Sequence, residues 1–168
     1  EGVPGCIKNG IDEKIANKIY DEMIDFAQYA FNKSHAAAYA YVTYQTAFLK
    51  YYYPVEYMAA LMTSVIDKPA KVAEYIQVCR QMNIPILPPD INKGEYGFSV
   101  SGGSILYALS AIKSVGRPVI EAIVAERKEH GEYLSVKNFI ERNMEAVNKR
   151  AIENFIKAGA LDCLEGNR

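Results

Sequence analysis

The chain has 168 residues, of which 50% are hydrophobic and 23% charged, so it can form a packed core and is too apolar for wholesale disorder. Its 19 basic and 20 acidic residues nearly cancel, so any surface for nucleic acid must be local. No apolar run approaches the roughly 20 residues that span a bilayer, and no signal peptide is recognisable. We therefore expect a soluble cytoplasmic protein with no membrane partner. Because it starts at Glu1 and continues Gly-Val-Pro-Gly, we interpret it as a piece of a larger protein.

The cysteines and histidines are too scattered for a metal site or a disulfide framework. Cys6, Cys79 and Cys163 lie far apart and are odd in number. His35 and His130 stand near neither a cysteine nor each other. We therefore expect no metal and no cofactor bound by this chain.

The first half of the chain is predicted to be helical. Apolar residues recur at helical spacing over residues 12–28, which indicates an amphipathic surface helix. A second helix is expected over 34–53, because Ser34 is a good capping residue and Pro54 stops the helix. Pro54 can itself open a helix. Further helices are expected over 54–65 and 72–82.

The second predicted helix is apolar on almost every side. Ala37, Tyr41, Tyr44 and Phe48 form one stripe, and other aromatic and aliphatic residues cover much of the remaining surface. A helix of this kind is either buried on most sides or docks against another domain. Two interpretations stay open: a tyrosine-lined core helix, or an aromatic platform for bases or for a neighbouring domain.

The second half begins with a proline-rich stretch, which we interpret as a domain boundary between residues 83 and 93. A β-hairpin is predicted over 97–108, with its turn at Ser101-Gly102-Gly103. Short helices are expected over 118–129, 136–142 and 149–158. The expected fold is mainly α, with domains at 1–83 and 84–168.

One segment combines a tight turn with cations. Lys113-Ser114-Val115-Gly116-Arg117 leads into a predicted helix, and its spacing resembles the helix-hairpin-helix motif of DNA-binding proteins. Glycine permits a tight turn, and the amides at the helix start favour a phosphate, to which Lys113 and Arg117 would add charge. The usual motif has glycine where this chain has Ser114. A plain turn is the alternative interpretation.

A second, looser pair of helices follows, and the two pairs could be related. A turn over 143–147 leads to Lys149 and Arg150 at the start of the last predicted helix, where the helix dipole disfavours cations. The two side chains either bind a phosphate or are only solvated.

A third segment places Lys33 and His35 beside Ser34 at the start of the aromatic helix. Amides, a cation and an imidazole at one point suit an anion. A simple helix cap explains the same residues.

Several segments resemble one protein family. Phe31-Asn32-Lys33-Ser34-His35 is similar to a strongly marked segment in the fingers of bacterial DNA polymerase III alpha subunits. Further segments match in the same order: Tyr44-Gln45-Thr46, Tyr53-Pro54-Val55-Glu56-Tyr57, Ile86-Leu87-Pro88-Pro89-Asp90, Ala111-Ile112-Lys113-Ser114-Val115-Gly116 and Ile156-Lys157-Ala158-Gly159-Ala160-Leu161-Asp162. Together they cover nearly the whole chain.

The resemblance implies a replicative polymerase of the C family. It implies that residues 1–83 form the later part of the fingers and residues 84–168 the helix-hairpin-helix region. Asn32, Lys33, Ser34 and His35 would face the incoming nucleotide; Lys113, Ser114, Val115, Gly116, Arg117, Lys149 and Arg150 would hold duplex DNA. The Mg²⁺-binding aspartates would lie in the palm upstream, so this chain alone should not polymerise DNA. Implied partners are primer–template DNA, a deoxynucleoside triphosphate, the rest of the polymerase, the sliding clamp and other replisome subunits.

Two other functions fit the residues. A free-standing helix-hairpin-helix module of a repair or accessory protein would also bind DNA. A helical scaffold with no nucleic-acid role would agree with the net charge of −1. Salt dependence of DNA binding separates these two alternatives.

Overall fold

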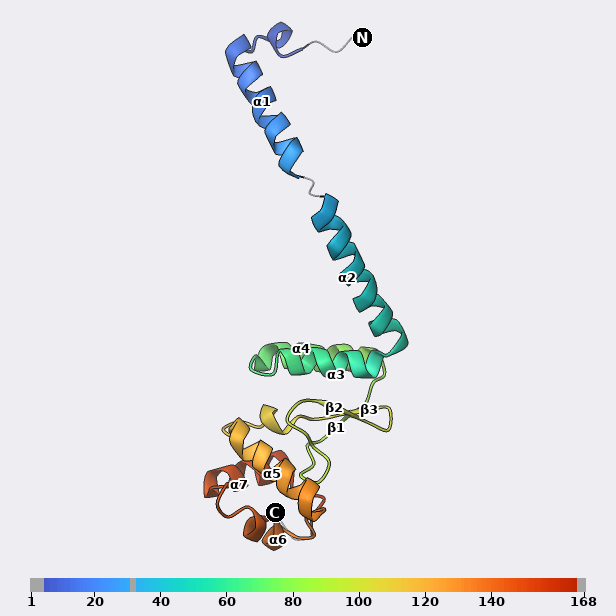
Figure 1. Ribbon diagram of the computed structural model, residues 1–168, viewed down its shortest axis with the longest axis vertical. Coiled ribbons are helices and arrows are strands. Elements are labelled where there is room, and N and C mark those ends of the chain that lie inside the picture. The colour runs from blue at the N-terminus through green and yellow to red at the C-terminus, as the bar shows by residue number, and fades with distance from the viewer. Residues whose placement is uncertain (1–4, 31–32, 166–168) are drawn as a thin grey trace. The chain divides into compact units, whose positions relative to one another are not determined.

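The computed structural model of the chain describes residues 5–30 and 33–165 (Figure 1). The chain divides into two units, residues 1–48 and 49–168, and each is described by itself. The first unit holds a 3-10 helix, η1 (Ile7–Asn9), the helix α1 (Glu13–Ala30) and most of α2 (Lys33–Tyr52).

Helix α1 confirms the amphipathic helix predicted over 12–28. The carboxylate of Asp12 accepts hydrogen bonds from the amides of Lys14 (2.9 Å) and Ile15 (3.3 Å), which caps the helix start. The apolar stripe is exposed, because no described residue of the first unit is buried.

Two expectations for α2 are wrong. The helix already begins at Lys33, so Ser34 lies within its first turn and is not its cap. Of the two interpretations left open, the tyrosine-lined core helix is wrong for this chain: residues 34–52 are all exposed, including Tyr41 and Tyr44. A helix that is apolar all round needs neighbours on several sides to be buried, and the described elements of the first unit do not bury α2. The role of α2 as an aromatic platform stays a prediction.

In the second unit, helices α3 (Pro54–Ser64) and α4 (Pro69–Gln81) pack against each other, and α3 packs on a small sheet (Figure 1). Each helix begins with proline in its first turn, as predicted for Pro54. Thr63 joins helix to sheet: its hydroxyl donates to Ala59 O (2.8 Å) and accepts from the Phe98 amide (3.0 Å). A Cβ on Gly97 would lie 2.8 Å from Thr63, so this close approach requires glycine.

The sheet contains β1 (Ile86–Leu87), β2 (Ser99–Ser101) and β3 (Ser104–Leu106) in the order β1-β3-β2. Strands β2 and β3 form the predicted hairpin, and Gly102 and Gly103 make its turn with φ of 56° and 77°. Positive φ at both turn residues gives the tight connection that glycine favours. The parallel pairing of β1 with β3 was not predicted.

The rest of the second unit is a helical bundle. It contains the 3-10 helix η2 (Leu109–Ala111) and helices α5 (Arg117–His130), α6 (Val136–Arg142) and α7 (Lys149–Ala158). Their apolar faces enclose a core that includes Ile120, Ile123, Phe139 and Phe155, all completely buried. The predicted bounds of α6 and α7 are confirmed, and those of α5 are off by one residue at each end.

A separate core lies between α3, α4 and the sheet, and it includes Met62 and Cys79 with Phe98 and Ile105. Burial raises the pKa of the Cys79 thiol. The predicted domain boundary between residues 83 and 93 stays a prediction, and residues on both sides of it share this core. None of the described helices has the length and apolar character needed to cross a bilayer.

Candidate nucleic-acid interface

The first hairpin joins η2 to α5 through residues 112–116. Val115 is 8% exposed, and its side chain packs into the core of the bundle and so anchors the loop. Ser114 precedes it with φ of 63°, a left-handed conformation that non-glycine residues rarely adopt. Ser114 stands where the usual motif has glycine, and its backbone conformation is one that glycine adopts easily.

Gly116 plays a different part from the one predicted for it. Its φ is −77°, so the tight turn does not require glycine here. A Cβ would meet only Pro118 Cδ at 3.7 Å, an ordinary contact. Gly116 is the N-cap of α5 and offers no side-chain oxygen to the amides of the first turn. The absence of a side chain leaves the start of α5 accessible to an anion.

The second hairpin, residues 143–148, resembles the first where its helix begins, although the positive φ of Ser114 has no counterpart at Ala146. Val147 is also 8% exposed in the same core, and Asn148 is the N-cap of α7. The cap dihedrals are nearly equal: φ −77° and ψ 154° at Gly116, φ −85° and ψ 165° at Asn148. Both cap carbonyls accept from the amides three and four residues later. The structure thus relates the two helix pairs, as the sequence suggested.

The caps of the two hairpins also differ. The side chain of Asn148 accepts a hydrogen bond from the Ala151 amide at 2.9 Å. One donor of the α7 start is therefore already satisfied, whereas the start of α5 has no side-chain cap. The start of α5 lacks a donor of its own, however, because Pro118 has no N–H, whereas Lys149 and Arg150 at the start of α7 both carry one.

Each hairpin carries a cation at the first position of its helix, Arg117 on α5 and Lys149 on α7. The Arg117 guanidinium is exposed, donates to Glu121 Oε1 at 2.7 Å and lies 4.8 Å from the centre of the Tyr96 ring. The hydrogen bond to Glu121 raises the pKa of Arg117. Among the described residues, no carboxylate forms an ion pair with Lys149 or Arg150.

Helix α7, which follows the second hairpin, also contacts the first hairpin. The Asn154 amide donates to the Lys113 carbonyl at 2.9 Å, which joins the first hairpin to α7. Arg150 lies four residues before Asn154 and Lys157 three residues after it, so the three share one helix face. Neither Asn154 nor Lys157 was predicted from the sequence, although their spacing from Arg150 was a usable signal.

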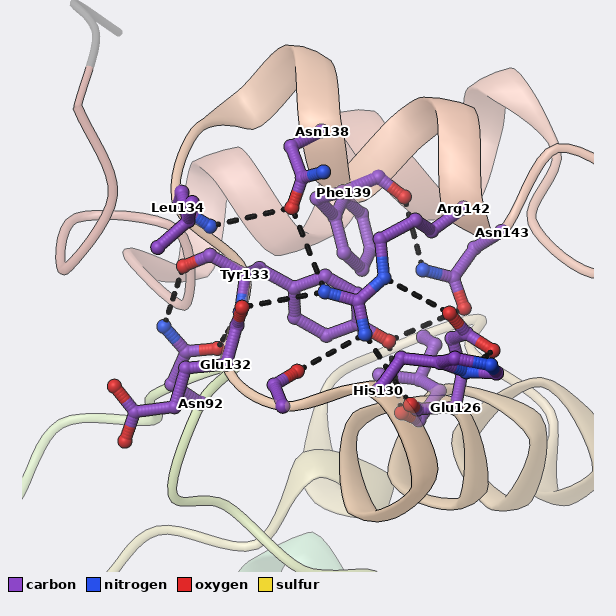
Figure 2. Close-up of polar contacts among 12 residues, drawn as sticks. Asn92, Glu126, His130, Glu132, Tyr133, Leu134, Asn138, Phe139, Arg142 and Asn143 are labelled. Atoms are coloured by element: carbon purple, nitrogen blue, oxygen red, sulfur yellow. Dashed lines mark hydrogen bonds and ion pairs between the residues drawn. The ribbon is translucent and has the colours of Figure 1, made fainter.

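A polar network behind the second hairpin holds α6 in place (Figure 2). The Arg142 guanidinium donates to Glu126 Oε1 (2.8 Å) and to the Gly131 carbonyl (2.9 Å), and lies 4.4 Å from the centre of the Tyr133 ring. His130 also contacts Glu126, with 2.9 Å between Nδ1 and Oε2. The hydrogen bond from Arg142 is the main cause of the lowered pKa of Glu126.

A second polar network, around Arg127 of α5, lies after the first hairpin. Arg127 of α5 is 8% exposed and donates to the carbonyls of Ile91 (2.8 Å) and Gly94 (2.9 Å). It also pairs with Glu95 at 3.2 Å. These bonds tie the loop after β1 to α5, the helix that follows the first hairpin.

The predicted nucleotide site lies in another part of the chain. Asn32 is outside the described residues, and Lys33 is described only as the first residue of α2. Ser34 and His35 occupy the first turn of α2 and are exposed. The His35 ring lies 4.4 Å from the Tyr39 ring, centre to centre. Their assignment to a nucleotide stays a prediction.

No group of three or more His, Cys, Asp or Glu side chains in the described part of the chain is arranged to hold a metal ion. The bundle offers backbone amides and cations, which suit a phosphate backbone and carry no base specificity.

Comparison with known proteins agrees with this geometry. Residues 83–168 match the family described as "Helix-hairpin-helix motif". The chain is 48% identical to DNA polymerase III subunit alpha of Thermus aquaticus over 161 residues, 95% of this chain. It is 48% identical to the Vibrio cholerae protein of that name over 166 residues and 49% identical to the Xylella fastidiosa one.

The chain spans 13% to 14% of the length of these curated relatives. The resemblance inferred from the quoted segments is thus confirmed across nearly the whole chain. Both the matched residues and the paired hairpins lead to one conclusion: the chain belongs to the helix-hairpin-helix motif family.

Proposed function

We propose that this chain is part of a replicative DNA polymerase of the DNA polymerase III alpha type and that its hairpins hold duplex DNA by the backbone. The observation that carries the proposal is that three features occur at the starts of both α5 and α7: a buried valine, a cap residue of nearly equal conformation and a cation at the first helical position. Two such sites joined along α7 suit two phosphates of one duplex. The relatives, all named as polymerase subunits, do not favour a free-standing repair module.

We propose also that residues 1–83 belong to the fingers, with residues 32–35 near the incoming nucleotide. The similarity to polymerase subunits over 95% of the chain supports this assignment. Polymerisation and its Mg²⁺ ions would belong to the remainder of such a subunit, so this chain alone would be inactive. Contacts with the clamp and other replisome subunits, and function in the cytoplasm, are part of the same proposal.

The test is fluorescence anisotropy of a labelled duplex against the chain over a salt series. We expect binding without sequence preference, with an affinity that falls as salt rises. Changing Lys113, Arg117, Lys149 and Arg150 to Gln should weaken binding at least about tenfold. The same change should reduce the salt slope by about 0.9 for each phosphate that the variant no longer neutralises.

The matched control changes four exposed lysines outside the hairpins, Lys68, Lys71, Lys128 and Lys137, to Gln. It removes the same charge and should lower the affinity much less. An equal decrease in affinity in both variants, or no binding by the unaltered chain at low salt, would contradict the proposal.

A further inference from the structure

A cavity of about 400 Å³ lies beside the first hairpin. Its walls come from the proline-rich segment (Pro89), the residue after β3 (Tyr107), the first hairpin (Ile112, Lys113) and α7 (Asn154, Lys157). The volume is within the usual range for small-ligand sites. The duplex contacts assigned above use only Lys113 from this set.

The charged groups of the cavity are both cationic. Lys113 and Lys157 contribute ammonium groups, and no acidic residue is among the lining residues. In the described part of the chain neither lysine has an ion pair. The bond from Asn154 to the Lys113 carbonyl fixes the two walls relative to each other. This arrangement favours an anion, and two ammonium groups suit the charge of a phosphate.

The remaining wall of the cavity is apolar. A phosphate makes no use of an apolar surface, so this wall suits a further part of the ligand. Tyr107 and Pro89 provide flat apolar surface, and the Tyr107 ring is held edge-on by Phe98 at 5.1 Å between ring centres. Aromatic rings of this kind stack nucleobases without sequence preference. Asn154 retains an amide oxygen that can accept a hydrogen bond from a base.

We propose that this cavity binds an unpaired nucleotide of a DNA strand, next to the duplex held by the hairpins. Its phosphate lies between Lys113 and Lys157, and its base lies against Tyr107. The inference rests on the proposed function, because it needs a duplex on the hairpins that continues into a single strand.

The test uses the whole chain and two probes, a blunt duplex and the same duplex with a short single-stranded extension. We expect the extended probe to bind about tenfold more tightly, as one stacked base provides. Lys157→Gln should abolish that preference and reduce the salt slope for the extended probe by about 0.7. Tyr107→Leu should abolish the preference without changing the salt slope. Lys137→Gln, in the exposed pair with Glu141 on α6, is the control and should leave the preference intact.

Several outcomes would overturn the inference. If the unaltered chain binds both probes equally, the cavity does not take an unpaired nucleotide, while the proposed duplex function stands. If Lys157→Gln weakens both probes equally, Lys157 is a duplex contact. If micromolar free dAMP removes the preference, the cavity takes free nucleotides and not a strand. Failure to bind either probe would contradict the proposed function itself.

Discussion

Ser114 bears a local strain that the motif usually avoids. Its φ of 63° places Cβ close to the following carbonyl, a conformation that costs an L-residue about 1 kcal/mol or more. Val115 beside it is buried, so the core holds Ser114 in this conformation. The packing of Val115 in the core therefore keeps Ser114 in a backbone conformation that glycine would adopt without strain.

Replacing Ser114 with Gly should therefore raise the free energy of unfolding by up to about 1 kcal/mol, and Ser114→Val should lower it by about 1 to 2 kcal/mol. Urea unfolding measures both. Ser104→Gly, at an ordinary strand position, is the matched control and should destabilise the chain. If Ser114→Gly destabilises the chain as much as Ser104→Gly does, the backbone of Ser114 is not strained.

Glu126 makes stability depend on pH. The hydrogen bond from Arg142 lowers its pKa in the folded chain below the ordinary value of 4.5. The unfolded chain therefore takes up this proton first as pH falls. The contribution of Glu126 is complete above the ordinary value and is lost as the pH passes through the lower folded value.

Urea unfolding of the unaltered chain and of Glu126→Gln, from about pH 6 to about pH 3, tests this dependence. The unaltered chain should be the more stable at the upper end, and the difference should shrink toward the lower end. A difference that stays constant over this range would show that Glu126 is not the titrating group.

At the scale of elements, the two hairpins have nearly equal cap dihedrals but different caps. Gly116 leaves the start of α5 without a side-chain cap, and Asn148 caps α7 through the Ala151 amide. The hairpins therefore show a specialisation of their caps: the start of α5 has no side-chain cap and no N–H at Pro118, whereas Asn148 caps the start of α7.

Gly116→Asn would make the first hairpin resemble the second. The added side chain should stabilise the fold by a few tenths of a kcal/mol, because it caps α5 and meets no close atom. It should weaken duplex binding about fivefold, because it occupies the place of one phosphate. Anisotropy and urea unfolding measure the two effects. Asn148→Gly is the reverse control, and equal duplex affinity in all three proteins would contradict the specialisation.

The sequence predicted the elements whose signals are local. Helices α6 and α7 have the predicted bounds, and each begins at a local cap, Ser135 or Asn148, which accepts a hydrogen bond from the helix start. The sequence did not predict pairings that depend on residues far apart in the chain. The bond from the Ile105 amide to the Pro85 carbonyl joins β3 to β1 across about twenty positions, and no local pattern announces it.

The candidate site shows the same division. Lys113, Arg117, Lys149 and Arg150 could be found from charge next to a turn. Asn154 and Lys157 share a helix face with Arg150, but their place beside the first hairpin follows only from the packing of α7 against it. Ser34 has the side chain of a capping residue, yet α2 begins one residue earlier, at Lys33, within the one or two positions by which helix ends vary.

At the scale of the whole molecule, stability resides in the second unit. Both apolar cores lie within residues 49–168, and no described residue of the first unit is buried. A chain of residues 49–168 should therefore unfold cooperatively, with a melting temperature close to that of the full chain. Circular dichroism of both chains tests this prediction, and loss of cooperative unfolding in the shorter chain would contradict it.

The central claim is that duplex DNA lies on the two hairpins. Amide ¹H–¹⁵N shifts of the chain, of mass 18.8 kDa, measured during titration with a duplex at low salt, test it most directly. We predict the largest changes at Ser114–Arg117 and Val147–Arg150, and little change in α4. Changes that gather on α4 or α1 and leave both hairpins unaffected would contradict it.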